Sequence, residues 1–81
     1  MPVISRFYGL TVRMNPRDHN PPHVHVLYGG KSACYTFDGA LLKGKLPPTA
    51  HDMASNWVKK NGAQLESIWQ TKDYKGLPPL L

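Results

Sequence analysis

Hydrophobic and polar residues alternate along the first half of the chain with the two-residue period that is typical of β-strands. In residues 3–14, the apolar residues at positions 10, 12 and 14 would share one face of a strand. Gly9 lies inside this stretch, where it forms either a bulge or a break between two short strands. Residues 15–22 contain three prolines, which exclude a helix and a central strand, so we expect a loop there.

The next stretches predict β-hairpins. Residues 23–28 and residues 32–37 both alternate, and the Gly29-Gly30 pair between them has the length of a tight hairpin turn. Asp38-Gly39 is a second hairpin signal, so residues 40–43 are expected to return as a short strand. Together with the N-terminal stretch, these segments predict an antiparallel meander of about four strands.

The second half of the chain changes to the period of amphipathic helices. Pro47-Pro48 ends the strand pattern, and Thr49 followed by Asp52 resembles a capping box for a helix that begins there. Apolar residues then recur through positions 50–58 at the i, i+3, i+4, i+7 and i+8 spacing of one buried face. Asn61 interrupts this pattern together with the glycine that follows it, and its side chain can cap the start of a second helix.

These patterns predict one domain over residues 1–81 with an α+β fold, in which a small antiparallel sheet of about four strands packs against two C-terminal helices. His51, on the first helix, is expected at the surface. The tail is expected to be extended, with the leucines at 77, 80 and 81 docked on the body or on a partner. The expected core consists of Val12, Val24, Val26, Tyr35, Phe37, Leu42, Met53, Trp57, Leu65, Ile68 and Trp69.

The charge of the chain is basic and unevenly distributed. Ten lysines and arginines oppose five aspartates and glutamates, which gives a formal charge of +5. Six of the basic residues and only two of the acidic ones lie in residues 1–45. This surplus favours an acidic partner, either nucleic acid or an acidic protein, although it also serves ordinary solubility.

Cysteine content and hydropathy indicate where the protein works. The one cysteine, Cys34, cannot form an internal disulfide and is expected to be a small buried hydrophobe in its strand, which fits a reducing compartment. The sequence has no run of about 20 apolar residues that would span a bilayer, and its N-terminus lacks the apolar core of a signal peptide. We therefore expect a cytoplasmic protein that makes no membrane contact.

Three of the four histidines lie within seven residues, at positions 19, 23 and 25. His23 and His25 are two positions apart on a predicted strand, so both side chains leave the same face with Cα atoms about 6.5–7 Å apart. That face lies opposite Val24 and Val26, so we expect the pair to be accessible. His19 approaches from a loop that two prolines stiffen, which lowers the cost of assembling a site.

A metal site is one interpretation of this cluster. Two histidines at strand spacing can chelate one ion, and His19 would complete a set of three ligands with an open position. Asp18 or Asn20 would then be a further ligand or would orient the histidines. The cofactor would be a divalent transition metal such as zinc.

Cleavage of a phosphodiester is the second interpretation. Imidazole can act as acid and as base at neutral pH, so His19, His23 and His25 would transfer protons and RNA would supply its own 2′-hydroxyl nucleophile. Such a reaction needs cations at the phosphate but no metal or other cofactor. An aromatic ring, that of Tyr8 or Tyr28, would stack on a base or donate a hydrogen bond. The candidate phosphate-binding residues are Arg6, Arg13, Arg17, Lys43 and Lys45.

In the third interpretation the histidines have no chemical role. They would be polar residues on a wet sheet face, or side chains that satisfy backbone groups of the loop. The residues themselves leave all three interpretations open.

The whole chain resembles a family of small bacterial proteins that is described as a domain of unknown function. The similarity rests on Met1-Pro2-Val3-Ile4-Ser5-Arg6-Phe7-Tyr8-Gly9, on Asp18-His19-Asn20-Pro21-Pro22-His23-Val24-His25, on Gly44-Lys45-Leu46-Pro47, and on Trp57 and Trp69. Members of that family are often encoded beside a second small protein, in an arrangement similar to a toxin–antitoxin module. The resemblance therefore implies a small cognate partner protein and favours a toxin that acts on RNA.

From residues and resemblance together, we predict a component of a bacterial toxin–antitoxin-like module. It would be a nucleic-acid-directed, ribonuclease-like effector that uses the histidine cluster, with RNA and an antitoxin-like protein as partners. The alternative is a non-catalytic metal-binding or protein-interaction module.

Overall fold

The computed structural model describes residues 2–74 and 76–79. Within these residues the chain forms five strands followed by two helices. The α+β class is confirmed, and the leucines at 80 and 81 lie outside the described residues. The elements are β1 (Val3–Phe7), β2 (Leu10–Arg13), β3 (His23–Tyr28), β4 (Lys31–Thr36), β5 (Leu41–Gly44), α1 (Pro48–Lys60) and α2 (Gly62–Thr71).

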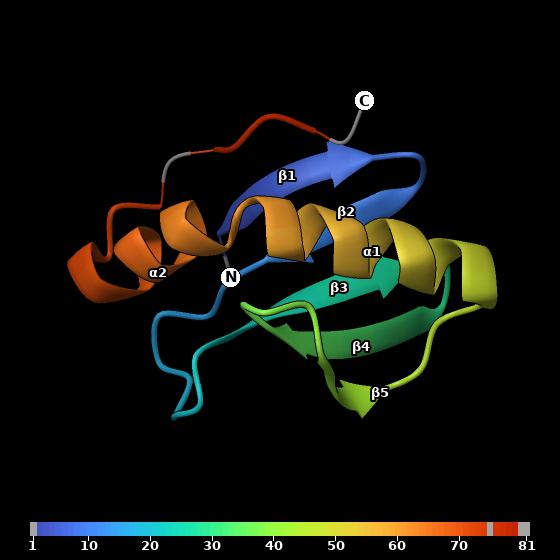
Figure 1. Ribbon diagram of the computed structural model, residues 1–81, viewed down its shortest axis with the longest axis horizontal. Coiled ribbons are helices and arrows are strands. Elements are labelled where there is room, and N and C mark those ends of the chain that lie inside the picture. Colours follow the sequence, from blue (N-terminus) through green and yellow to red (C-terminus); the bar gives the residue numbers. More distant parts are fainter. Residues whose placement is uncertain (1, 75, 80–81) are drawn as a thin grey trace.

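The strands form one antiparallel sheet in the order β1-β2-β3-β4-β5, so each strand pairs with its neighbour in sequence (Figure 1). The expectation of about four strands was wrong by one, because the N-terminal stretch breaks into β1 and β2 at a tight turn. Tyr8 and Gly9 both have positive φ there, at 47° and 81°. Two successive residues of that conformation match the right-handed twist of the flanking strands and reverse the chain.

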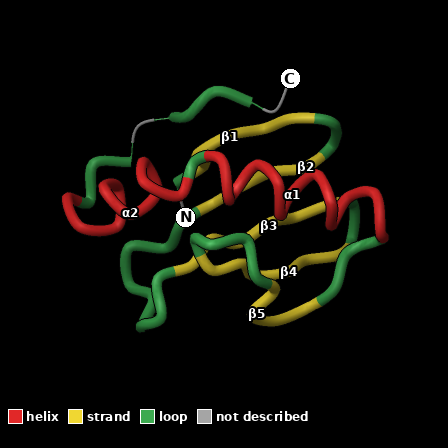
Figure 2. Tube along the Cα trace, in the orientation of Figure 1, coloured by secondary structure: helices red, strands yellow, loops and turns green. Residues whose placement is uncertain are grey.

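Both helices pack on one face of the sheet, and the core lies between the two layers (Figure 2). The side chains of Val24 and Val26 on the strands and of Trp57 on α1 have no solvent exposure. Burial of one such aliphatic side chain stabilises the fold by about 1.5–3 kcal/mol. The expected core residues that are buried are Val12, Val24, Val26, Tyr35, Trp57, Leu65, Ile68 and Trp69.

Three expected core residues lie at the margin. Phe37 and Met53 are partly buried and pack against the core. Leu42 is 44% exposed, so its assignment to the core was wrong. It belongs to β5, an edge strand whose four residues are all exposed. Leucine in a short strand gives no signal that distinguishes an edge from a covered position.

The helix boundaries correct two predictions. Helix α1 begins at Pro48, because proline suits the first helical turn, where a backbone N–H would have no partner within the helix. No side chain caps this end of the helix. The expected capping box of Thr49 is therefore absent at the described start of α1. Asn61 separates the helices as expected, but its side-chain amide donates to the carbonyl of Trp57, 2.9 Å away. Asn61 thus closes α1 and does not cap α2.

The segment after α2 returns across the sheet edge. The backbone N–H of Leu77 donates to the carbonyl of Ile4, and the side chain of Leu77 packs against the core. The indole N–H of Trp57 donates to the carbonyl of Pro78. This part of the expected tail docks on the body.

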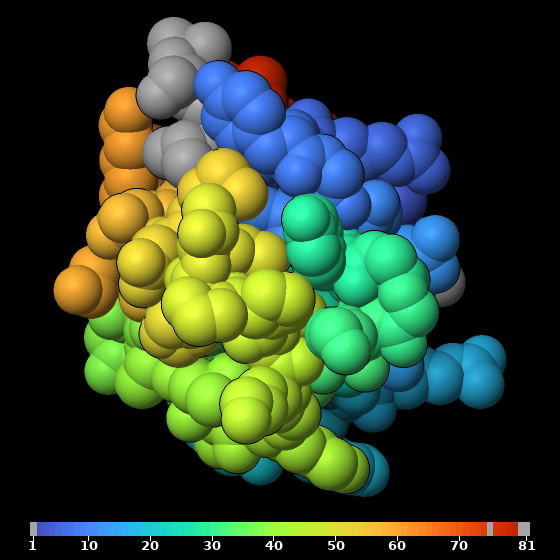
Figure 3. All heavy atoms as spheres, turned by 90° about the vertical axis from the view of Figure 1, so that its right-hand side faces the viewer, coloured from blue at the N-terminus to red at the C-terminus, as the bar shows by residue number. Residues whose placement is uncertain are grey.

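The sheet face opposite the helices is covered in part by the loop between β2 and β3. Figure 3 shows α1 on one side of the molecule and the blue-green atoms of this loop projecting on the other. The loop contains the proline-rich residues 15–22, as predicted. Over the described residues, neither helix combines the length and the apolar character needed to cross a bilayer.

Candidate functional site

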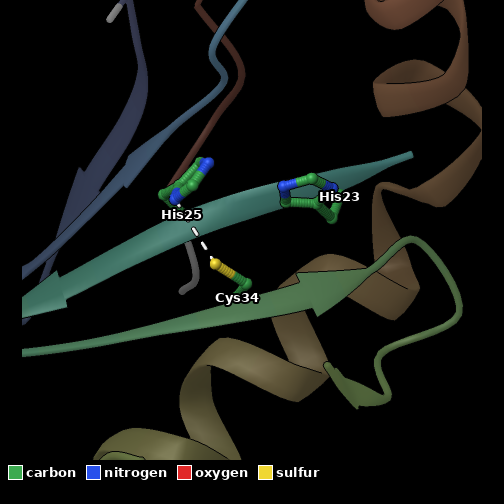
Figure 4. Close-up of side chains that lie close together, drawn as sticks. All are labelled: His23, His25 and Cys34. Atoms are coloured by element: carbon green, nitrogen blue, oxygen red, sulfur yellow. Dashed lines mark hydrogen bonds between the residues drawn. The ribbon is translucent and has the colours of Figure 1, made fainter. Parts of the chain in front are cut away.

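The hairpin of β3 and β4 places His25 beside Cys34. Their Cα atoms are direct partners across the two strands, and Nδ1 of His25 lies 3.3 Å from Sγ of Cys34. The ring of His23 is on the same face, with its centroid 5.1 Å from that of His25. Figure 4 shows both rings extending from β3 and the thiol extending from β4 toward His25. The rings of His23 and His25 therefore lie close together, as predicted.

Asp18 joins this group from the loop. Its Oδ2 lies 2.6 Å from Nε2 of His25 and 3.2 Å from Nε2 of His23. Because an ionised carboxylate can only accept hydrogen bonds, Nε2 of His25 carries the proton and donates it to Asp18. In the neutral ring of His25 the lone pair is then on Nδ1, which faces Cys34.

His23 is held by the loop backbone. Its Nδ1 lies 2.7 Å from the carbonyl oxygen of Pro21, and a carbonyl only accepts, so Nδ1 carries a proton. In the neutral ring, Nε2 of His23 then carries the lone pair, and in the charged ring it donates to Asp18. Both histidines therefore present Nε2 to the same carboxylate, and they differ in the partner of Nδ1, which is the carbonyl of Pro21 for His23 and the thiol of Cys34 for His25.

Cys34 is a thiol in this environment. Burial raises the pKa of Cys34, the Asp18 carboxylate raises it further, and Lys43 lowers it. The neutral S–H therefore donates to Nδ1 of His25. Cys34 was expected to be only a buried hydrophobe, whereas it is half-buried and in contact with His25. The sequence did contain a signal for this contact, because a two-residue turn at Gly29-Gly30 pairs position 34 with position 25.

The cluster is less open than expected. The side chains of His23, His25 and Asp18 retain 13%, 24% and 17% of their exposure. The β2–β3 loop causes this cover, since it brings Asp18 and Pro21 onto the strand face. What remains is a depression of about 490 Å³. The residues that line it include Asp18, His19, His23, His25, Cys34 and Lys43.

Two of the predicted phosphate-binding residues lie at the cluster. Lys43, on β5, is the Cα partner of Cys34, and Arg13, on β2, is the Cα partner of His25. The Nε atom of Arg13 is buried and has no hydrogen-bond partner within the described residues. His19 lines the depression but is exposed, and Asp18 instead of His19 makes the contact with the ring of His25.

The other predicted site residues lie elsewhere. Arg6 is exposed on β1, and Tyr8 is 61% exposed in the β1–β2 turn, at the opposite end of the strands from His23. Arg17 is exposed in the loop, and Lys45 lines a second depression together with Lys31 and Pro47. None of these four residues is among those that line the histidine depression in the described part of the chain.

The fourth histidine, His51, was expected at the surface, and it is half-buried. Its Nδ1 accepts a hydrogen bond of 2.8 Å from the hydroxyl of Tyr35, on the core side of the sheet. This bond satisfies a buried phenol. His51 therefore has a structural role at a distance from the cluster.

Comparison with known proteins places the chain in a family. A family model described as "Domain of unknown function (DUF4160)" matches residues 9–70. The chain belongs to the DUF4160 family. The matched segment contains Asp18, His23, His25 and Cys34, so the entire cluster lies inside the DUF4160 domain. No curated protein and no solved structure matched the chain.

Proposed function

We propose that this DUF4160 protein is a ribonuclease-like effector of a two-protein bacterial module. In this proposal His23 and His25 cleave RNA by general acid–base catalysis, and a small partner protein neutralises the activity. The observation that carries the proposal is that two imidazoles share one carboxylate through Nε2, while Nδ1 of His23 is bound to a carbonyl and Nδ1 of His25 faces a thiol. This difference supports a division of roles in which one ring acts as the acid and the other as the base.

His25 is the candidate base. Asp18 holds its Nε2–H, so the lone pair on Nδ1 faces the depression, where the thiol of Cys34 now donates to it. A ribose 2′-hydroxyl that replaces the thiol would donate to the same nitrogen. A base that a carboxylate orients in this way is a recurring arrangement in nucleophilic catalysis.

His23 is the candidate acid. Its Nδ1–H is engaged by Pro21, and in the charged ring Nε2–H is stabilised by Asp18. The 2′-oxygen would bond to phosphorus while its proton passes to Nδ1 of His25. The bond from phosphorus to the 5′-oxygen would break, and that oxygen would take the Nε2 proton of His23. The products are a 2′,3′-cyclic phosphate and a free 5′-hydroxyl.

Cations at the cluster support binding of the phosphate. Lys43 lines the same depression, and Arg13 lies beside His25 in the sheet. Positive groups fixed near a phosphoryl oxygen stabilise the charge that develops there during the reaction. The net charge of +5 favours approach of a polyanion.

The partner is proposed from the family resemblance and from this charge. An anionic segment of a second small protein could cover Lys43, Arg13 and the depression. It would neutralise the effector by occupying the place of RNA. Co-purification of the protein with the product of the adjacent gene would support this part of the proposal, and its absence would count against it.

The direct test uses purified, untagged protein in the presence of a chelator. It compares an RNA oligonucleotide with a DNA oligonucleotide of the same base sequence. We expect cleavage of RNA only, with a cyclic phosphate at the new end, because DNA lacks the 2′-hydroxyl. His23→Ala and His25→Ala should each slow cleavage by about 10²–10⁴-fold. His51→Gln, outside the cluster, is the matched control and should cleave at the rate of the unmodified protein.

The same variants can be tested in cells. Expression of the unmodified protein without its partner should arrest growth, and His23→Ala and His25→Ala should not. Equal cleavage of DNA and RNA, full activity of both alanine variants, or no activity in the unmodified protein would refute the proposed reaction.

A further inference from the structure

We infer that His23, His25 and Cys34 form a binding site for a single divalent transition metal ion of the zinc type. This inference does not depend on the proposed RNA cleavage, because it rests only on the positions and hydrogen bonds of three side chains. From the sequence, His19 was expected to be the third ligand of a metal site. The geometry replaces His19 with Cys34.

The three side chains are already near coordination distance. One potential ligand atom from each residue lies within 4.8 Å of the others. A tetrahedral zinc ion with bonds of about 2.0–2.3 Å separates neighbouring nitrogen and sulfur ligands by about 3.3–3.6 Å. Nδ1 of His25 and Sγ of Cys34 are 3.3 Å apart and meet this spacing.

The hydrogen bonds leave the required lone pairs available. Pro21 accepts from Nδ1 of His23, so Nε2 of His23, which lies 3.2 Å from Oδ2 of Asp18, is the nitrogen that would coordinate. Asp18 accepts from Nε2 of His25, so Nδ1 of His25 is free to coordinate. Metal-bound histidines almost always donate their other ring nitrogen to a carbonyl or a carboxylate, which fixes the tautomer and orients the ring. Both partners are present here, one of each kind.

The donor set indicates the class of metal. Two imidazoles and one thiol suit zinc and other borderline or soft ions, and they do not suit magnesium or calcium, which take oxygen ligands. Binding would deprotonate Cys34 and release that proton to solvent, because a coordinated thiol is held as the thiolate. Three protein ligands leave a fourth position for water or another small ligand, on the side of the depression.

The rigid frame lowers the cost of assembling the site. His25 and Cys34 lie on adjacent paired strands, and His23 is on the same strand as His25. The sheet therefore fixes all three Cα positions before an ion arrives, and little conformational entropy is lost on binding. His19, by contrast, is on the exposed loop.

A bound ion would also control the proposed reaction. It would occupy the Nδ1 lone pair of His25, which acts as the base, and the Nε2 atom of His23, which acts as the acid. The metal-loaded protein is therefore expected to be inactive on RNA. Metal binding is measured in the absence of RNA. Failure to bind metal and failure to cleave RNA are therefore separate results.

The test measures Zn²⁺ affinity of purified, untagged protein by competition with a chromophoric chelator, and the absorption spectrum of the Co²⁺-loaded protein. We expect one ion per chain and a thiolate-to-cobalt charge-transfer band. Cys34→Ser should abolish the band and weaken Zn²⁺ binding by more than tenfold. Loss of a residue that only orients a ligand already lowers metal affinity by about tenfold or more, and loss of a ligand should lower it at least as much. His19→Gln is the matched control and should retain the affinity and the band.

Circular dichroism and urea unfolding would establish that each variant is folded. His25→Gln, which keeps a side chain of similar size, provides a second ligand variant if Cys34→Ser unfolds. Sub-stoichiometric Zn²⁺ in the folded, unmodified protein would overturn the inference. So would a folded Cys34→Ser that binds as tightly as the unmodified protein, or a His19→Gln variant that loses the ion.

Discussion

Oδ2 of Asp18 lies 2.6 Å from Nε2 of His25, and this bond ties the β2–β3 loop to the middle of the sheet. Asp18 also approaches Nε2 of His23 at 3.2 Å. One carboxylate therefore sets the orientation of both rings. Whatever chemistry the cluster performs, Asp18 is the residue through which the loop controls it.

The first prediction concerns this carboxylate. Asp18→Asn keeps an acceptor for Nε2 of His25 but removes the charge that stabilises a protonated ring, so RNA cleavage should fall by more than tenfold. Asp18→Ala also removes the hydrogen bond and should lower the free energy of unfolding by about 1–2 kcal/mol. Cleavage rates and urea unfolding of the two variants separate these effects. Full activity of Asp18→Asn would show that the charge is not used.

The second prediction concerns the packing of β5 against β4. Gly44 has φ of 82°, and a Cβ built there would overlap the carbonyl oxygen of Ser32 and lie 2.9 Å from Cα of Ala33. Gly44→Ala forces the backbone to move and should destabilise the protein by about 2 kcal/mol or more.

The matched control is Gly30→Ala, because a Cβ at Gly30 meets nothing within 4 Å. Its unfolding free energy should change by less than about 0.5 kcal/mol. Urea midpoints that are equal for the two variants would show that β5 is not held as described.

The third prediction concerns the reactivity of Cys34. Its pKa is raised, chiefly by burial, and the thiolate is the form that reacts with alkylating agents. At neutral pH, alkylation by iodoacetamide should be slower than that of a short cysteine peptide, and the rate should rise as the pH increases. Mass spectrometry of quenched samples measures both rates. A rate equal to that of the peptide at neutral pH would contradict the environment described for Cys34.

The fourth prediction concerns acid stability. The hydroxyl of Thr36 and the backbone N–H of Ala40 donate to Asp38 and lower its pKa. A lowered pKa means that the folded state binds the proton less readily than the unfolded state. The contribution of ionised Asp38 to the stability of the fold is therefore complete above the ordinary aspartate pKa of about 3.9. It is lost as the pH falls through the lowered pKa of the folded state.

Asp38→Asn removes the titrating group, so the loss of stability on going from pH 5 to pH 2 should be smaller in the variant. Unfolding curves at several pH values measure this slope. An identical slope in the variant and in the unmodified protein would assign the acid sensitivity to other carboxylates.

Much of the fold was predictable because alternation of apolar residues reports which face of a strand is buried. Val24 and Val26 were correctly assigned to the core, and this places His23 and His25 on the opposite face. Gly9 indicated either a bulge or a strand break, and alternation alone could not choose between them, since the positive φ of Tyr8 interrupts no pattern. Leu42 was misplaced because an edge strand has the same composition as a covered one.

The site was predictable in part for the same reason. The spacing of His23 and His25 predicted their common face. The two-residue turn at Gly29-Gly30 also implies that Cys34 pairs with His25, but that contact was not predicted. Asp18 was expected only as one of two residues, with Asn20, that would bind a metal or orient the histidines, and the choice between them was not predictable in that way. It depends on the path of a proline-rich loop across the sheet, and a loop has no periodicity from which that path could be derived.

The central claim is that His23 and His25 act as one acid–base pair. The most direct test is a double-mutant cycle on the rate of RNA cleavage, with His23→Ala, His25→Ala and the double variant. Residues that act as a unit are strongly non-additive. We predict that each single variant loses about 10²–10⁴-fold in rate and that the double variant loses little more. Independent, multiplicative losses, or single variants that cleave RNA as fast as the unmodified protein, would contradict the pair.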